Sequence, residues 1–115
     1  MEKEMLDLIK QTAAFISGKI KDMPQTVIFL GTGLGAFVNH FDITDELAYE
    51  DIPNFPVSTV EGHSGKLIFG QLGNKRIMAM KGRFHFYEGY NMQLVTFPVR
   101  VMKELGITTL FVSNA

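Results

Sequence analysis

Apolar residues recur at helical spacing near the start of the chain, which predicts a first helix over residues 3–21. The residue triplet Met23-Pro24-Gln25 then breaks the pattern. A run of apolar and β-branched residues at 26–30 predicts a short strand, buried on both faces of a sheet. The face of the helix expected to be buried carries Met5, Leu6, Ile9, Ala13, Ile16 and Ile20.

Two strand-like runs, at 66–72 and 75–81, are separated only by Gly73-Asn74. Because a two-residue separation is typical of a tight turn, these runs predict a β-hairpin. Residues 36–60 show no clear period, and the two prolines among them favour a loop or an edge strand.

Helical spacing returns after Asn91, a suitable N-cap residue, and continues to Leu105, just before Gly106. Pro98 lies inside this predicted helix and is expected to kink it or to mark a break. The final apolar run, at 107–112, predicts a second buried strand.

The predicted order of elements is helix, strand, glycine-rich turn, hairpin, helix and strand, which favours an α/β layered domain. The chain has 115 residues, which suits one small domain. Only three residues follow the last strand, so no helix after it can cover that strand. Parallel strands are normally covered on both faces. We therefore expect residues 1–115 to be the unfinished N-terminal part of a single domain.

Composition narrows the possible functions. The net charge of −1 gives no general basic field for nucleic acid or anionic membranes. The absence of cysteine excludes a disulfide scaffold, a thiolate zinc site and a cysteine nucleophile. The first residues do not resemble a signal peptide, and no apolar run reaches 18 residues, so we expect a cytoplasmic protein. The three histidines lack zinc-ligand spacing, so no metal is expected, and His40 is interpreted as a surface residue.

The turn Gly31-Thr32-Gly33-Leu34-Gly35 follows the first predicted strand directly. Glycines allow backbone N–H groups to approach an anion closely, and Thr32 adds a hydroxyl donor. The G-x-G-x-G spacing matches neither the dinucleotide fingerprint nor the P-loop. On its pattern alone, the segment is equally well explained as a plain tight turn between a strand and a helix.

A second candidate is the segment 81–90, which begins at the end of a predicted strand. Arg83 offers a planar fork of donors that suits phosphate, and His85 lies two residues later. The alternative is a solvated loop whose aromatic residues pack beneath it, although loop positions of this kind commonly carry function. His63, in a third glycine-bounded segment, is on its own more typical of an ordinary loop residue.

These segments together resemble the trimeric-type purine nucleoside phosphorylases. The stretches GTGLGAF, VEGHSGKLIFG, KGRFHFYEGY and FVSNA occur in that family's order along nearly the whole chain. The resemblance implies a phosphorylase/hydrolase-like α/β layered fold with a twisted, mostly buried central sheet flanked by helices. It also implies that the chain covers about the first 40% of a family member.

The resemblance further implies an enzyme that converts purine ribo- or deoxyribonucleosides and inorganic phosphate into free base and sugar 1-phosphate. Inorganic phosphate is then a co-substrate, no other cofactor is expected, and the partners are a purine nucleoside, phosphate and further copies in a homotrimer. Neither nucleic acid nor a membrane is an expected partner. The same resemblance leaves two alternatives open: a methylthioadenosine phosphorylase, or a non-catalytic fragment that binds phosphate or oligomerises.

Carried over residue by residue, the resemblance assigns the sugar contact to Tyr87 and a catalytic as well as a phosphate-binding role to His85. The family's Glu and Asn that stabilise the leaving purine lie further along than this sequence extends. We therefore expect the 115-residue chain alone to be inactive. The phosphate ligands implied are Thr32, His63, Arg83, His85 and the backbone N–H of Ala115.

Overall fold

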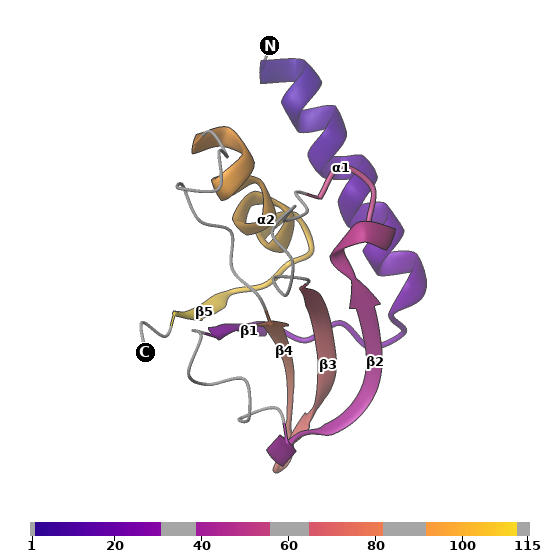
Figure 1. The fold of residues 1–115 in the computed structure, drawn as a ribbon, viewed down its shortest axis with the longest axis vertical. Helices are drawn as coiled ribbons and strands as arrows, with labels where there is room; N and C mark the ends of the chain where they lie inside the picture. Colours follow the sequence, from indigo (N-terminus) through magenta and orange to yellow (C-terminus); the bar gives the residue numbers. More distant parts are fainter. Residues whose placement is uncertain (1, 31–38, 56–64, 82–91, 113–115) are drawn as a thin grey trace.

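The computed structural model describes residues 2–30, 39–55, 65–81 and 92–112 (Figure 1). The expected mixture of helices and strands is confirmed, with one strand, β2, that the sequence did not predict. The elements are α1 Glu2–Lys19, β1 Thr26–Leu30, β2 Asp42–Ala48, the 3-10 helix η2 Tyr49–Asp51, β3 Lys66–Leu72, β4 Lys75–Lys81, α2 Met92–Glu104 and β5 Thr109–Val112.

The first helix, α1, closely follows the predicted range. Its first turn carries Glu2 and Glu4 and its last turn carries Lys19, which suits the helix dipole. The expected buried face is confirmed at Ile9, Ala13, Ile16 and Ile20 but wrong at Leu6, which is 41% exposed. Leu6 lies in the N-terminal turns, which extend beyond the end of the sheet (Figure 1).

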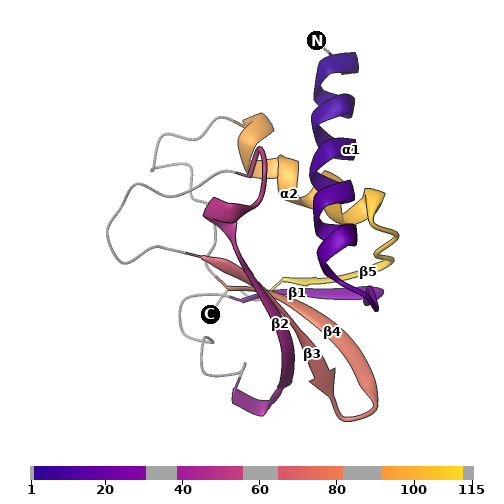
Figure 2. The same ribbon diagram turned by 90° about the vertical axis from the view of Figure 1, so that its right-hand side faces the viewer.

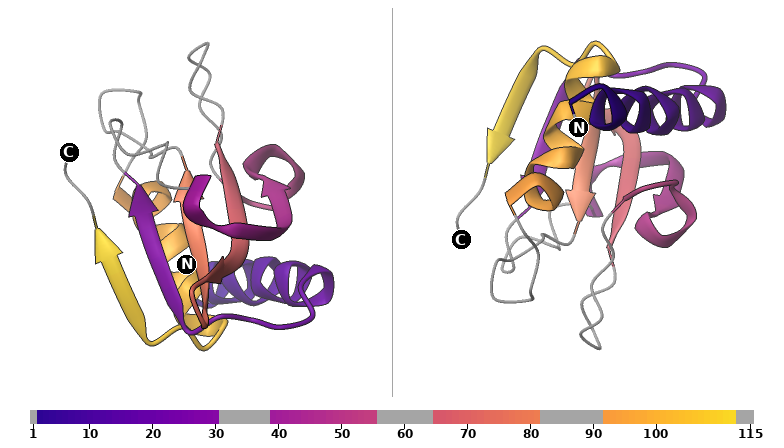
Figure 3. Two further views of the ribbon diagram at one scale, coloured as in Figure 1. Left: turned by 90° about the horizontal axis from the view of Figure 1, so that it is seen from below. Right: turned by 90° about the horizontal axis from the view of Figure 1, so that it is seen from above.

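The five strands form one mixed sheet in the order β2-β3-β4-β1-β5. Strand β1 pairs in parallel with β4 on one side and with β5 on the other. Strands β2, β3 and β4 pair antiparallel. Figure 3 shows β1 and β5 side by side, running in the same direction.

The predicted hairpin is confirmed at both strands and at the turn. Leu72 pairs with Lys75 across the turn, and Lys66 pairs with Lys81 at the open end. Gly73 has a φ of 67°, which is the conformation that a two-residue hairpin turn of type II′ requires of its first central residue.

Strand β2 forms one edge of the sheet and pairs with β3, with a register shift between Ile43 and Asp45. The loop or edge strand expected at the two prolines is a loop at Pro53 and Asn54, which lie in a turn after η2, and Pro56 lies outside the described residues. The acidic side chains of β2 lie exposed or half-buried along the edge, as suits a strand that should not pair with another molecule.

Both helices cover one face of the sheet (Figure 2). Side chains alternate along β3, so Leu67 and Phe69 join the core beneath the helices, whereas Ile68 joins a smaller cluster on the opposite face. The smaller cluster contains Phe41, Ile68, Ile77 and Ala79. The core beneath the helices includes Ile9, Ala13, Ile16, Val27, Tyr49, Phe55, Leu67, Phe69, Met78, Met80, Phe97, Val101 and Met102.

Helix α2 ends as its sequence predicts. Gly106 has a φ of 88° and its N–H donates to the Lys103 carbonyl, while the N–H of Ile107 donates to the Met102 carbonyl. These two bonds define a Schellman C-cap. The helix runs through Pro98, so this proline does not end it, and the predicted N-cap Asn91 lies outside the described residues.

Strand β5, Thr109–Val112, differs from the buried strand expected at 107–112 in its bounds and in its burial. It begins at Thr109 because Ile107 belongs to the cap of α2. Burial was expected, yet Leu110 is 45% and Phe111 58% exposed. Among the described elements β5 pairs only with β1 and is an edge strand, which explains the exposure.

Candidate functional site

The five strands are aligned so that one terminus of each lies at the same end of the sheet. Leu30 pairs with Lys81, Phe29 with Val112, and Lys66 with Lys81. We call this end, marked by Leu30, Lys66, Lys81 and Val112, the site end. The other end, marked by Thr26, Asp42, Gly73-Asn74 and Thr109, is the turn end.

All four candidate segments are joined to the site end. The glycine-rich turn follows β1, the Arg83 segment follows β4 and the closing FVSNA stretch begins within β5, whereas the His63 segment leads into β3. In an α/β sheet, ligands bind beyond the carboxyl ends of parallel strands. The predicted residues themselves lie outside the described part of the chain, and they are Thr32, His63, Arg83, His85, Tyr87 and Ala115.

The described residues nearest to these segments are closely packed. The N–H of Tyr49 donates to the carbonyl of Gly65, 3.1 Å away. A Cβ atom on Gly65 would overlap the Tyr49 ring and lie 2.8 Å from the Lys81 carbonyl oxygen. Only glycine fits between these two groups, so the start of β3, the end of β4 and the first residue of η2 are held together.

Charges at the site end include two lysines that face each other in the hairpin register, Lys66 and Lys81. Lys66 forms an ion pair with Glu46 on β2, with 2.6 Å between Nζ and Oε1, and Lys81 is exposed.

The Tyr49 side chain is 3% exposed, and its burial raises the pKa of the phenol well above 10.0. Tyr49 is thus neutral and serves as a packing group.

The described residues offer no cluster of three His, Asp or Glu side chains that could hold a metal ion. None of the described helices has the length and apolar character needed to cross a membrane.

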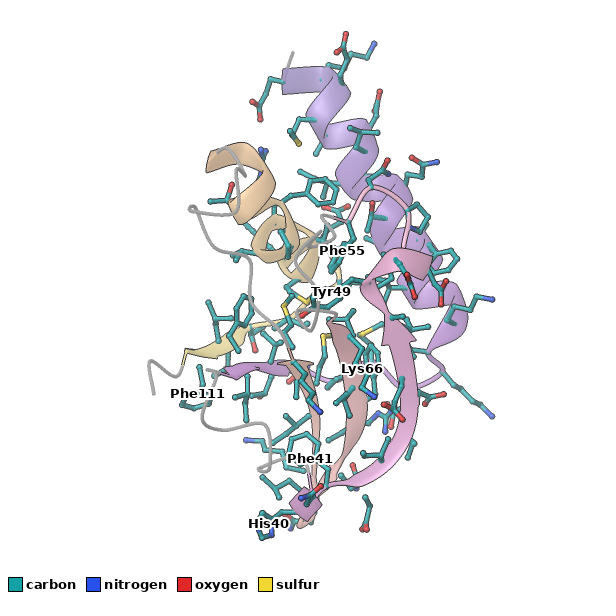
Figure 4. All side chains as sticks on the ribbon, viewed as in Figure 1. His40, Phe41, Tyr49, Phe55, Lys66 and Phe111 are labelled. Atoms are coloured by element: carbon teal, nitrogen blue, oxygen red, sulfur yellow. The ribbon has the colours of Figure 1, made fainter. Side chains whose placement is uncertain are left out.

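A cavity of about 120 Å³ between α2 and β5 is lined mainly by apolar groups and lies toward the turn end, away from the candidate segments. His40 is exposed, as its interpretation as a surface residue requires (Figure 4).

Two residues that organise the site end, Tyr49 and Gly65, were not singled out from the sequence. Tyr49 lies in a stretch that gave no clear period. Gly65 is one of the two glycines that bound the segment of His63. The available signal was the glycine directly before a strand-like run, since a glycine there can mark a close approach of two chain segments.

Comparisons with known proteins, by family model, by sequence and by structure, agree with one another. The family model described as "Phosphorylase superfamily" matches residues 19–115. Purine nucleoside phosphorylase 1 of Bacillus subtilis is 53% identical over 111 residues, which are 96% of this chain and 41% of that protein. The chain thus spans about two fifths of the length of this relative, as the sequence led us to expect.

Solved structures agree. A Schistosoma mansoni purine nucleoside phosphorylase complexed with a monocyclic inhibitor superposes with a TM-score of 0.86 at 41% identity, covering 95% of this chain and 40% of that one. A purine nucleoside phosphorylase in complex with ribose-1-phosphate gives 0.82 at 44% identity, covering 96% and 40%. By sequence and by fold, the chain belongs to the phosphorylase superfamily and resembles its purine nucleoside phosphorylases.

Proposed function

We propose that this sequence supplies the phosphate-binding part of an enzyme that cleaves purine nucleosides with inorganic phosphate. The products would be the free purine and ribose or deoxyribose 1-phosphate. The relatives at about half identity carry the name purine nucleoside phosphorylase, and one similar structure holds ribose-1-phosphate. These names favour this activity over the methylthioadenosine phosphorylase alternative.

The observation that supports the proposal is the shared origin of the candidate segments at the site end. Thr32 and Arg83 each follow a strand end by two residues, and those ends, Leu30 and Lys81, are paired neighbours. Two residues of chain span at most about 7 Å. His63 is likewise two residues from Gly65, which is packed against the Lys81 carbonyl. Connectivity therefore allows all three side chains to reach one ligand.

The proposed chemistry follows from these donors. A phosphate oxygen forms a bond to C1′ of the sugar while the bond from C1′ to the purine nitrogen breaks, and the electron pair leaves with the purine. Positive charge grows on the sugar in the transition state. Arg83, Thr32 and His85 would hold the phosphate dianion as nucleophile and counter-charge, which removes much of the entropic barrier.

Turnover needs a second set of groups that stabilise the departing purine. The chain spans only 41% of the Bacillus subtilis relative, and the resemblance places those groups further along. We therefore propose that the 115-residue chain binds phosphate but does not release hypoxanthine from inosine. The homotrimer implied by the resemblance is a further part of this proposal, and sedimentation velocity tests it.

The test is a titration of the folded chain with inorganic phosphate, followed by ³¹P NMR, beside an inosine assay. We expect the wild-type chain to bind phosphate, Arg83→Ala to bind it much more weakly, and neither protein to release hypoxanthine. A folded wild-type chain that does not bind phosphate would refute the proposed phosphate site. Phosphate-dependent release of hypoxanthine would refute the proposed division of labour.

A further inference from the structure

Tyr49 is the first residue after β2 and lies almost fully buried between the sheet and the helices (Figure 4). Its backbone N–H donates to Gly65, and its ring fills the space where a Gly65 side chain would stand. Gly65 is the residue at which the described chain resumes before β3, two positions after His63. Tyr49 therefore fixes the C-terminal flank of the segment that carries His63.

The same ring also contacts the N-terminal flank of that segment. The ring centroids of Tyr49 and Phe55 lie 5.4 Å apart with an interplanar angle of 58°. Phe55 is the last described residue before segment 56–64. The two flanks of the His63 segment are thus packed on one side chain, which is buried to 3% exposure.

The Arg83 segment is tied to this point as well. The Lys81 carbonyl belongs to the N-terminal flank of the Arg83 segment. A Cβ atom on Gly65 would lie only 2.8 Å from the oxygen of this carbonyl. Beyond its other flank, Phe97 of α2 meets Phe55 edge-on, with 6.4 Å between centroids. Contacts of the described residues that flank both candidate segments therefore converge on Tyr49 and Phe55.

A second set of contacts keeps Phe55 in register with the rest of the fold. The Thr12 hydroxyl of α1 lies 2.9 Å from the Pro53 carbonyl, and Asn54 Nδ2 donates to Thr12 Oγ1 at 3.2 Å. Asn54 has a φ of 67°, a conformation that asparagine adopts more readily than most residues. The backbone that enters the His63 segment is consequently anchored to a buried threonine of the helix.

We propose that Tyr49 is a positioning residue of the phosphate site: its ring holds the flanks of the His63 segment together and sets their distance from the start of the Arg83 segment. This inference rests on the proposed function for its ligand. Its physical basis is that strand ends held in place before phosphate binds lower the entropic cost of bringing the ligand donors together.

The closing experiment compares four variants of the 115-residue chain. Tyr49→Leu removes the ring, Tyr49→Phe retains it, and Gly65→Ala inserts a methyl group against it. Gly70→Ala is the matched control, because its Cβ would lie 2.5 Å from the Asp42 carbonyl oxygen, near the turn end and away from the site. For each variant we would measure the dissociation constant for inorganic phosphate by NMR titration, together with the midpoint of thermal unfolding.

The expected result is a phosphate affinity weakened about tenfold or more in Tyr49→Leu and Gly65→Ala, and changed less than about twofold in Tyr49→Phe and Gly70→Ala. Gly70→Ala should still lower the unfolding temperature. If Gly65→Ala and Gly70→Ala both lower that temperature and leave the affinity unchanged, Tyr49 is only a core residue and the inference is wrong.

A measurement on the wild-type chain covers the case in which the variants do not fold. Saturating phosphate should slow hydrogen exchange at the Tyr49 amide, which is bonded to Gly65, more than at the Thr109 amide, which is bonded to Gln25 at the turn end. Equal slowing at both amides would overturn the inference.

A wild-type chain that binds no phosphate refutes the proposed function instead. In that case the positioning role is decided by exchange in Tyr49→Phe and Tyr49→Leu, where only the leucine should speed exchange in both segments 56–64 and 82–85.

Discussion

The two ends of the sheet are closed in different ways. At the turn end, Gly73-Asn74 joins β3 to β4, and the backbone N–H groups of Thr108 and Thr109 donate to the Gln25 carbonyl. Arg76 adds a polar network by donating to the Asp22 carbonyl and to Thr44 Oγ1. The backbone at the turn end is therefore closed by short connections and local hydrogen bonds.

At the site end, by contrast, the strands lead into segments rich in glycine, basic residues and aromatic residues. The described contacts there, between Tyr49, Gly65 and Lys81, hold strand ends together rather than completing a turn. One end of this sheet is closed by its own turn and hydrogen bonds, whereas the other leads into the segments proposed to bind phosphate, a division expected of α/β sheets.

The largest expected effect concerns Arg83, which follows the end of β4 by two residues. Arg83→Ala should weaken phosphate binding by roughly ten- to 150-fold, the equivalent of about 1.5–3 kcal/mol for a hydrogen bond to a charged group. Isothermal titration with phosphate measures this change. The unfolding midpoint should stay near the wild-type value.

Arg76→Ala is the matched control at the turn end. Its loss removes bonds to Asp22 and Thr44 and weak ion pairs to Asp22 and Asp45, so stability should fall by about 1–3 kcal/mol. Phosphate affinity should be unchanged. A loss of affinity as large as that in Arg83→Ala would show that the two ends are not functionally distinct.

A smaller effect is expected from the phenol at the site end. Burial raises the pKa of Tyr49 above its ordinary 10.0, so the unfolded chain loses this proton at a lower pH than the folded chain does. The contribution of the protonated Tyr49 phenol to the free energy of unfolding is fully present below pH 10 and is lost as the pH rises further. Between pH 10 and 11 the wild type should lose up to about 1.4 kcal/mol more than Tyr49→Phe. Denaturant unfolding of both proteins measures the difference, and parallel pH profiles would contradict it.

The turn end allows a further test through Gly73. Because φ is 67° at this position, Gly73→Ala should lower the free energy of unfolding by about 1 kcal/mol. Urea unfolding would measure this loss, and phosphate binding should be unaffected. Stability equal to that of wild type would mean that the turn relaxes to another conformation.

The smallest expected effect concerns a contact that belongs to neither end. Arg100 on α2 and Glu2 on α1 form an ion pair of 2.9 Å, and both side chains are more than two fifths exposed. Arg100→Ala should therefore change stability by less than about 1 kcal/mol, and less still in high salt. A larger loss, measured by urea unfolding, would show that the helix pair depends on this contact.

Much of the fold could be predicted because local signals agreed with the final packing. The hairpin at 66–72 and 75–81, strand 26–30 and the glycine that ends α2 all follow from turn chemistry and apolar runs. Strand β2 was not predicted, because its acidic residues have low strand propensity and it is held by pairing with β3. Burial of β5 was wrong because an apolar run does not reveal whether its strand lies at a sheet edge.

The candidate site was predicted only in part. Its segments could be identified because each adjoins a predicted strand end, and the parallel register of β1, β4 and β5 confirms that those ends coincide. The roles of Thr32, His63, Arg83, His85, Tyr87 and Ala115 remain predictions. Tyr49 could not be found from its sequence context, because its contacts with Gly65 and Phe55 depend on tertiary packing.

The central claim is that the motif-bearing segments form one phosphate site at the site end. The most direct test is a titration of the ¹⁵N-labelled chain with inorganic phosphate, following the backbone amide shifts. We expect saturable changes at residues 31–35, 61–65, 81–85 and 113–115, and none at Gly73, Arg76 or Thr109. Changes centred on the turn end, or no saturable change in a folded chain, would contradict the account.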